Sequence, residues 1–174
     1  MERRLRVGVV GGGMFFDDII GPALRDFQRG GLAGALGSIG MSHWAPRVAD
    51  IAIDFVAIGT RSARRGTADS IRDSFLDEFP QAGLKAYYGE TVWRDMMAGE
   101  RLDILLVASP DHLHTQPILE ALAAGLHVIT EKPLCLKTAE ADAIVAAAER
   151  AGRVVAVDMH KRYDPFVREM MTNS

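Results

Sequence analysis

The sequence contains almost no cysteine and no long apolar run. Cys135 is the only cysteine among the 174 residues, which excludes a disulfide framework and a cysteine-based metal site and fits a reducing compartment. No stretch approaches 18 consecutive apolar residues, so no membrane span is expected. The apolar run before Gly11 is too short for the core of a signal peptide. We therefore expect a cytoplasmic protein.

The chain also lacks a large excess of charge of either sign. The formal net charge is −3 and the sequence pI is about 5.9, with basic residues scattered along the chain. This pattern predicts neither a nucleic acid nor a membrane surface as partner. Hydrophobic residues make up 48% of the chain, enough for the core of one domain but not of two large ones.

Short apolar segments alternate with segments of helical periodicity. Such alternation indicates βαβ units and a parallel sheet, so the expected fold class is α/β, a doubly wound (Rossmann) sheet in a single domain. The expected strands are Leu5–Val10, Ile53–Ile58, Ala86–Tyr88, Ile104–Ala108, Leu126–Ile129 and Val154–Val157. The expected helices are Asp17–Gln28 with a break at Gly21-Pro22, Ala63–Phe79, Val92–Ala98, Pro117–Ala124, Ala139–Ala151 and a final segment from Asp164.

A segment rich in glycine and alanine interrupts this alternation. It occupies about residues 29–50, with its glycines between 30 and 40. Frequent glycine disfavours a regular element, so the segment is expected to be an inserted loop. Two readings remain, a mobile loop and a lid over a bound ligand, and the composition favours the mobile loop.

The first expected strand leads directly into Gly11-Gly12-Gly13. A glycine turn between the first strand and a helix is where a doubly wound sheet binds the pyrophosphate of a dinucleotide, through free backbone N–H groups and the helix dipole. Gly11 and Gly13 are the expected cofactor contacts. The third glycine of the fingerprint is replaced by Phe16, so we expect a shifted helix. Because turns use glycine freely, a structural turn is the alternative.

The end of the second expected strand bears on which dinucleotide binds. NAD sites place an acidic residue there to accept from the ribose 2′-hydroxyl. The stretch 58–65 has no acid but has arginines and hydroxyls, which suit a 2′-phosphate. NADP is therefore favoured over NAD, with Thr60, Arg61 and Ser62 as contacts. A solvated basic start of a helix is the alternative.

Two polar clusters follow the fourth and fifth expected strands. They read Ser109-Pro110-Asp111-His112-Leu113-His114 and Glu131-Lys132-Pro133. Ligands of a doubly wound sheet lie beyond the carboxyl ends of its strands. Both clusters are therefore expected at the edge that holds the glycine turn.

The motifs together resemble the N-terminal half of the glucose–fructose oxidoreductase, inositol dehydrogenase and MocA family (Gfo/Idh/MocA). The matching stretches are VGVVGGG (7–13), SPDHLH (109–114), ALAAGLHVITEKPL (121–134) and HKRYDP (160–165). The resemblance implies an oxidoreductase that uses NADP or NAD to transfer hydride to or from a sugar, polyol or related substrate.

The resemblance also implies roles for single residues. Lys132 matches the lysine near the nicotinamide and the substrate hydroxyl, where it can exchange a proton as hydride moves. Glu131, the residue before it, is expected to hold the ammonium of the lysine or to contact the ribose. The other implied cofactor contacts are Met14 and Phe15 beside the diphosphate, Ser109, Pro110, Asp111 and His114 beside the ribose, and Arg162.

Family members carry a second α/β domain with the substrate pocket and an aspartate and histidine that work with the lysine. We expect residues 1–160 to form the dinucleotide-binding domain and 161–174 to begin the connection to that absent domain. The chain alone is expected to bind cofactor with little or no turnover. An apolar face left open is expected to promote self-association.

Two other functions fit parts of the sequence. One is a non-catalytic dinucleotide-binding module or a truncated relic, with no turnover of its own. The other is a metal-dependent hydrolase that uses His112 and His114, with Asp158 and His160 nearby, because two histidines at a strand end can reach one metal. In that case the glycine turn would have no purpose.

Overall fold

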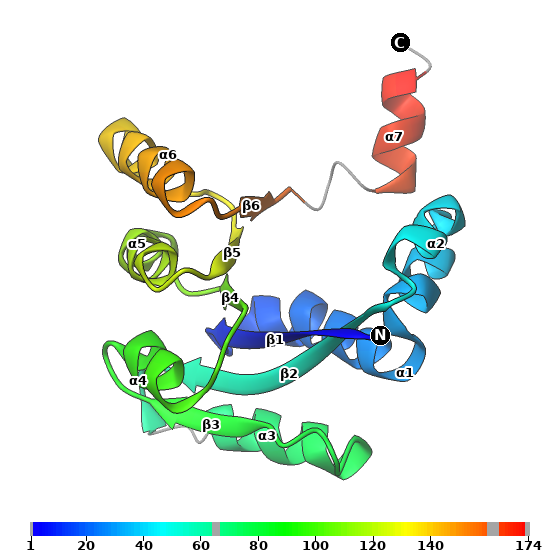
Figure 1. Cartoon of the computed structure of the whole chain (residues 1–174), viewed down its shortest axis with the longest axis horizontal. Coiled ribbons are helices and arrows are strands. Elements are labelled where there is room, and N and C mark those ends of the chain that lie inside the picture. The colour runs from blue at the N-terminus through cyan, green and yellow to red at the C-terminus, as the bar shows by residue number, and fades with distance from the viewer. Residues whose placement is uncertain (1, 64–66, 160–163, 173–174) are drawn as a thin grey trace.

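The computed structural model describes residues 2–63, 67–159 and 164–172. Its centre is a six-stranded sheet in the order β3-β2-β1-β4-β5-β6, in which every neighbouring pair is parallel (Figure 1). This order confirms the doubly wound prediction. The strands are β1 (Arg3–Val10), β2 (Ile51–Thr60), β3 (Lys85–Tyr88), β4 (Ile104–Val107), β5 (His127–Glu131) and β6 (Val155–Asp158).

Helices cover both faces of the sheet and create two apolar cores. On one face lie α1 (Gly21–Ser38) and α3 (Thr67–Glu78), and on the other lie α4 (Val92–Gly99), α5 (Thr115–Ala123) and α6 (Thr138–Ala151) (Figure 1). Successive strand residues point to opposite faces, so Val9 joins the first core and Val10 the second. The last helix is α7 (Pro165–Thr172). Within the described ranges, no helix combines the length and apolarity that crossing a membrane requires.

The helix after the glycine turn explains how Phe16 replaces a glycine. Phe16 begins a π-helical turn, Phe16–Ile20, and its side chain is 2% exposed. A Cβ at Gly21 would lie 3.1 Å from the Phe16 ring, so the absence of a side chain at Gly21 makes room for that ring. The helix continues through Gly21-Pro22 with helical dihedral angles at Gly21, and the predicted break there is wrong. The wide turn absorbs the shift instead.

The segment predicted to be an inserted loop is mostly helical. α1 extends to Ser38, a 3-10 turn spans Ser42–Trp44, and α2 spans Ala45–Val48. Residues 30–33 lie beside the start of β2, around a shallow cavity shared with residues 48–53. That end of the sheet is opposite to the carboxyl ends of the strands (Figure 1). The loop prediction is wrong, because packing against the sheet outweighs the low helix propensity of glycine. At this position the segment does not form a lid over the carboxyl ends of the strands.

Two glycines in α1 should respond to alanine in opposite directions. Gly34 has helical dihedral angles and nothing within 4 Å of an added Cβ, whereas Gly31 kinks the helix at φ 64° and ψ −179°. Gly34→Ala is expected to raise the free energy of unfolding by about 1 kcal/mol. Gly31→Ala is expected to lower it by about 1–3 kcal/mol. Urea unfolding measures both changes in the free energy of unfolding. Changes of the same sign would contradict the kink at Gly31.

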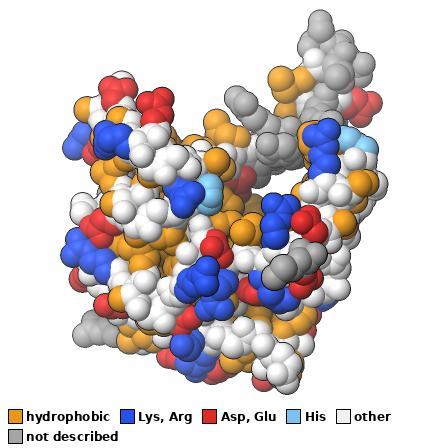
Figure 2. Space-filling view, viewed as in Figure 1, with side chains coloured by type: hydrophobic (Ala, Val, Ile, Leu, Met, Phe, Trp, Pro, Cys, Tyr) orange, Lys and Arg blue, Asp and Glu red, His pale blue; other side chains and the backbone are white. Residues whose placement is uncertain are grey.

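One face of the sheet is only partly covered over β4, β5 and β6. Leu105 and Val128 point toward α5 and α6 and are 0% and 1% exposed. Their neighbours Leu106 and Ile129, which point to the other face, are half-buried, and Ala156 is exposed. Figure 2 shows a hollow with apolar side chains on its floor on this side of the molecule. The surface is consistent with the expected self-association, which stays a prediction.

Candidate functional site

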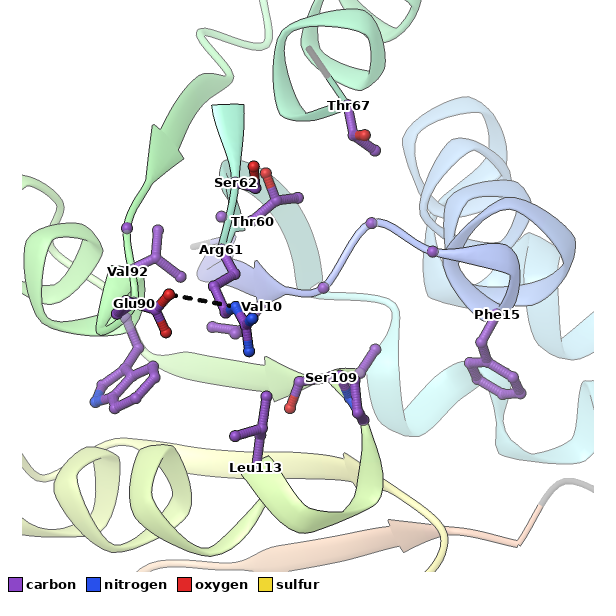
Figure 3. Close-up of a pocket in the computed structure, with 18 of the residues that line it drawn as sticks. Val10, Phe15, Thr60, Arg61, Ser62, Thr67, Glu90, Val92, Ser109 and Leu113 are labelled. Atoms are coloured by element: carbon purple, nitrogen blue, oxygen red, sulfur yellow. Dashed lines mark ion pairs between the residues drawn. The ribbon is translucent and has the colours of Figure 1, made fainter. Parts of the chain in front are cut away.

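A cavity of about 750 Å³ lies along the carboxyl ends of β1, β2 and β4. Four segments surround it: the glycine turn, the end of β2 with the start of α3, the β3–α4 connection, and the loop after β4 (Figure 3). This is the edge at which doubly wound sheets bind ligands. The lining residues that the sequence predicted as cofactor contacts are Gly11, Gly13, Met14, Phe15, Thr60, Arg61, Ser62, Ser109 and Pro110.

The three glycines of the turn differ in what the fold requires of them. Gly11 has φ 114°, and a Cβ there would lie 2.3 Å from the carbonyl oxygen of Ala108. A Cβ at Gly12 would lie 2.8 Å from the Ile71 side chain. At Gly13 nothing lies within 4 Å and φ is not positive. Folding therefore explains the first two glycines but not the third.

Gly13 also stands where the helix begins. Its carbonyl oxygen accepts from the N–H groups of Phe16 and Asp17, at 2.9 and 3.2 Å. The helix N-terminus thus opens onto the cavity at a residue without a side chain. This arrangement lets an anionic group approach the backbone closely.

Two hydroxyl groups in the cavity wall have no hydrogen-bond partner among the residues that the structure describes. Thr60 Oγ1, at the end of β2, and Ser109 Oγ, just after β4, are buried and unpaired among the described residues. Both residues line the cavity. A buried polar group without a partner costs free energy. A ligand with hydroxyl or phosphate oxygens would fit these groups, and a nicotinamide dinucleotide carries both.

An ion pair crosses one end of the cavity. Arg61 Nε lies 3.4 Å from Glu90 Oε1, and the side chains are 62% and 80% exposed (Figure 3). Such an exposed pair contributes little stability, so the guanidinium can exchange its partner for a stronger anion. Sequence reasoning missed Glu90 because it searched for an acid only after β2. The parallel register that pairs Thr60 with Tyr88 brings the residues after β3 beside Arg61.

The wall beyond this pair is apolar, and the sequence did not predict it. Val92 and Trp93 come from the start of α4, and Leu113 comes from the loop after β4. The Trp93 Nε1–H donates to Glu120 at 2.8 Å. The Arg94 guanidinium beside Glu120 holds the pKa of that carboxyl at about 2. The Trp93 ring, held by this hydrogen bond, is part of the cavity wall. The sequence feature that could have indicated it is an aromatic residue in the first turn of α4.

The loops after β4 and β5 meet, as predicted, and His114 joins them. This side chain is 0% exposed. Its Nδ1 lies 2.8 Å from the carbonyl oxygen of Pro133, and its Nε2 lies 2.7 Å from that of Ser109. Each ring nitrogen thus lies within hydrogen-bonding distance of a backbone carbonyl oxygen in one of the two loops. His114 therefore connects the loop after β4 to the loop after β5 and does not line the cavity.

Three of the remaining predicted residues do not line the cavity. Lys132 and Asp111 are exposed, and Glu131 is buried at the end of β5. Burial and the neighbouring Asp158 carboxylate raise the pKa of Glu131 to about 7. Arg162 falls outside the described residues.

The alternative metal site is not assembled in the part of the chain that the structure describes. His112 is exposed, and both nitrogens of His114 face carbonyl oxygens. No group of three histidine, cysteine, aspartate or glutamate side chains gathers there in a metal-binding arrangement. His160, a further residue of that hypothesis, is outside the described ranges.

Comparison with protein families identifies the lineage. Residues 5–159 match the model of the oxidoreductase family with an NAD-binding Rossmann fold. The chain belongs to the Gfo/Idh/MocA oxidoreductase family. The match includes the glycine turn and both loops, which confirms the resemblance seen in the sequence.

Curated relatives within this family are considerably longer than this chain. D-glucoside 3-dehydrogenase from Escherichia coli is 34% identical over 110 residues, which cover 60% of this chain and 31% of the relative. D-apiose dehydrogenase from Paraburkholderia graminis is 34% identical over 91 residues, covering 51% and 24%. The matched segments thus span about a third or less of the length of these relatives.

Solved structures share the fold. The WlbA dehydrogenase from Bordetella pertussis, in complex with NADH and UDP-GlcNAcA, matches with a TM-score of 0.64 and 22% identity over 90% of this chain and 35% of that one. A variant of a 3-ketoreductase from Actinomadura kijaniata, in complex with TDP-benzene and NADP, matches with a TM-score of 0.66 and 23% identity, covering 97% and 41%. At these identities the likeness shows the fold alone.

Proposed function

We propose that the cavity binds NADP, in preference to NAD, with the pyrophosphate at the glycine turn. The observation that carries the proposal is Gly13, whose lack of a side chain no feature of the fold requires. The unpaired hydroxyls of Thr60 and Ser109 support it. Pro110, Met14 and Phe15 border the same space. The bound cofactor supplies a hydride donor or acceptor.

Preference for NADP rests on the charge at the end of β2. Arg61 is the cation there, and its partner Glu90 is mostly exposed and readily displaced. A 2′-phosphate offers the guanidinium two oxygens and a larger charge. Thr60 and Ser62 place hydroxyl groups beside it. Glu90 opposes this preference, because its carboxylate repels the phosphate and can accept from the 2′-hydroxyl of NAD.

The proposed reaction is hydride transfer at a sugar, polyol or related hydroxyl or carbonyl group. The names of two relatives, a glucoside dehydrogenase and an apiose dehydrogenase, support this substrate class. Lys132, at the end of β5, would give or take the proton of the substrate oxygen. The chain alone is expected to show little turnover. Substantial oxidation of sugars by the purified 174 residues would contradict that expectation.

Substitutions at the ion pair should separate the two cofactors. Arg61→Gln is expected to weaken NADPH binding about tenfold or more, the value of one charge-assisted contact, and to change NADH binding little. Glu90→Gln is expected to strengthen NADPH binding. Arg150→Gln, an exposed position on α6, is the control for a lost positive charge. Equal losses for both cofactors in Arg61→Gln would contradict the role of Arg61.

Thermal unfolding with added ligand tests the proposed site as a whole. NADP⁺ at saturating concentration should raise the midpoint of the chain, since a ligand that binds only the folded state stabilises it. ADP-ribose should raise it less, and glucose alone should not. A midpoint that no dinucleotide moves would contradict the proposal.

A further inference from the structure

Two carboxyl groups lie side by side at the edge of the sheet. Glu131 ends β5 and Asp158 ends β6, and the two residues are partners in the parallel register. Glu131 is 7% exposed, and its Oε1 is buried without a hydrogen-bond partner among the described residues. Asp158 is half-buried. Side chains in register on adjacent strands point to the same face, so the two carboxyls share one environment.

Among the residues that the structure describes, the surroundings of Glu131 offer little compensation for two negative charges. The charged groups that act on it are Asp158 from β6 and Lys132 from the loop after β5. The Lys132 side chain is exposed, so its attraction is screened by solvent. Burial penalises an ionised carboxylate, and a like charge penalises it further. Both effects raise the pKa of Glu131, to about 7.

We propose that the Glu131 carboxyl keeps its proton in the folded chain and shares it with the adjacent carboxyl of Asp158, with Asp158 as the positioning residue that retains this proton on Glu131. The pair then carries one negative charge instead of two beside Lys132. A neutral Glu131 cannot form an ion pair with the Lys132 ammonium, which stays available to a substrate oxygen. This consequence for Lys132 rests on the proposed function, whereas the shared proton does not.

The shared proton makes the stability of the fold depend on pH. In the unfolded chain Glu131 titrates near 4.5, and in the folded chain near 7. Between these values the folded state binds more protons, so stability falls as pH rises through this window and stays lower above it. Asp158→Asn removes the like charge and supplies an N–H donor. It should therefore raise the unfolding midpoint at pH 8 and change it little at pH 5.

The direct experiment is carbon-detected NMR of the chain labelled with ¹³C at glutamate side-chain carboxyls, without cofactor. Glu131→Gln assigns the Glu131 signal by removing it. In the wild-type chain this signal should titrate near pH 7. In Asp158→Asn the midpoint should fall by about one pH unit or more. Asp142→Asn, an exposed aspartate on α6, should leave it unchanged.

Two results would overturn the proposal. One is a Glu131 midpoint near 4.5 in the wild-type chain. The other is a midpoint near 7 that Asp158→Asn does not move, which would leave burial as the sole cause. Because no cofactor is added, either result tests the shared proton independently of whether the cavity binds a dinucleotide. If Asp158→Asn fails to fold, the midpoint in Asp158→Glu, which retains the charge, should remain above 6, and a value near 4.5 would contradict the proposal.

Discussion

Replacing Gly13 with valine is expected to weaken NADPH binding about 100-fold or more while leaving the fold intact. Apart from its chain neighbours, no heavy atom of the described residues lies within 4 Å of a Cβ at this position, and the backbone has no positive φ. The added side chain meets only the space assigned to the pyrophosphate. Losing two backbone hydrogen bonds to a charged group costs about 3 kcal/mol or more, which corresponds to that change in affinity. Fluorescence titration with NADPH measures the loss.

The fold serves as the control for this substitution. The free energy of unfolding of Gly13→Val should stay within about 1 kcal/mol of the wild-type value, because the position is exposed. Gly34→Ala, which alters an exposed glycine far from the cavity, should leave NADPH affinity unchanged. Wild-type affinity in Gly13→Val would show that the glycine turn does not hold the cofactor.

Replacing His114 with alanine is expected to lower the free energy of unfolding by about 3 kcal/mol or more. The ring is fully buried and joins the carbonyl groups of Ser109 and Pro133. Its removal leaves two partly buried carbonyls without the ring as their partner, at about 1–3 kcal/mol each. The loop after β4 then loses its connection to the loop after β5, so NADPH affinity should fall as well. Urea unfolding measures the first effect.

His112 is the matched control, two residues earlier in the same loop. Its side chain is exposed, so His112→Ala should change the free energy of unfolding by less than about 0.5 kcal/mol. A similar cost for both histidines would mean that the whole loop, and not the His114 bridge, determines stability.

The strands were predictable because their signal is local. Each expected strand is a short apolar run such as Ile104–Val107, in which alternate residues are buried and half-buried, and this composition is visible in the sequence directly. The turn at Gly11 was predictable for the same reason, since it follows the first strand immediately. The pairing of strands then placed the glycine turn, the end of β2 and the loop after β4 around one cavity, as the fold class requires.

The errors arose where packing decides the outcome. The glycines of residues 30–40 suggested a loop, yet only Gly31 and Gly40 of them adopt positive φ and the rest fit helices or turns. Contact between α1 and β2 supplies the stability that glycine lacks in isolation. Phe16 seemed to disrupt the helix start, but the absent side chain of Gly21, five residues later, accommodates it.

Contacts between site residues of different strands could not be predicted from the sequence either. Glu90 reaches Arg61 only because β3 pairs with β2. His114 joins loops that are separated by a helix and a strand, and Asp158 meets Glu131 only through the register of β5 and β6. A motif shows that such residues are present. The partner of each is determined by the register between neighbouring strands and by the path of the loops, which only the folded structure provides.

Direct titration of the purified chain with NADPH and with NADH tests the central claim, that this cavity is a nicotinamide dinucleotide site with a preference for the 2′-phosphate. Nicotinamide fluorescence reports binding at equilibrium. Saturable binding of both, tighter for NADPH and reduced in Gly13→Val, is the predicted result. Saturable binding that favours NADH would remove the role given to Arg61, and the absence of binding by either would contradict the site itself.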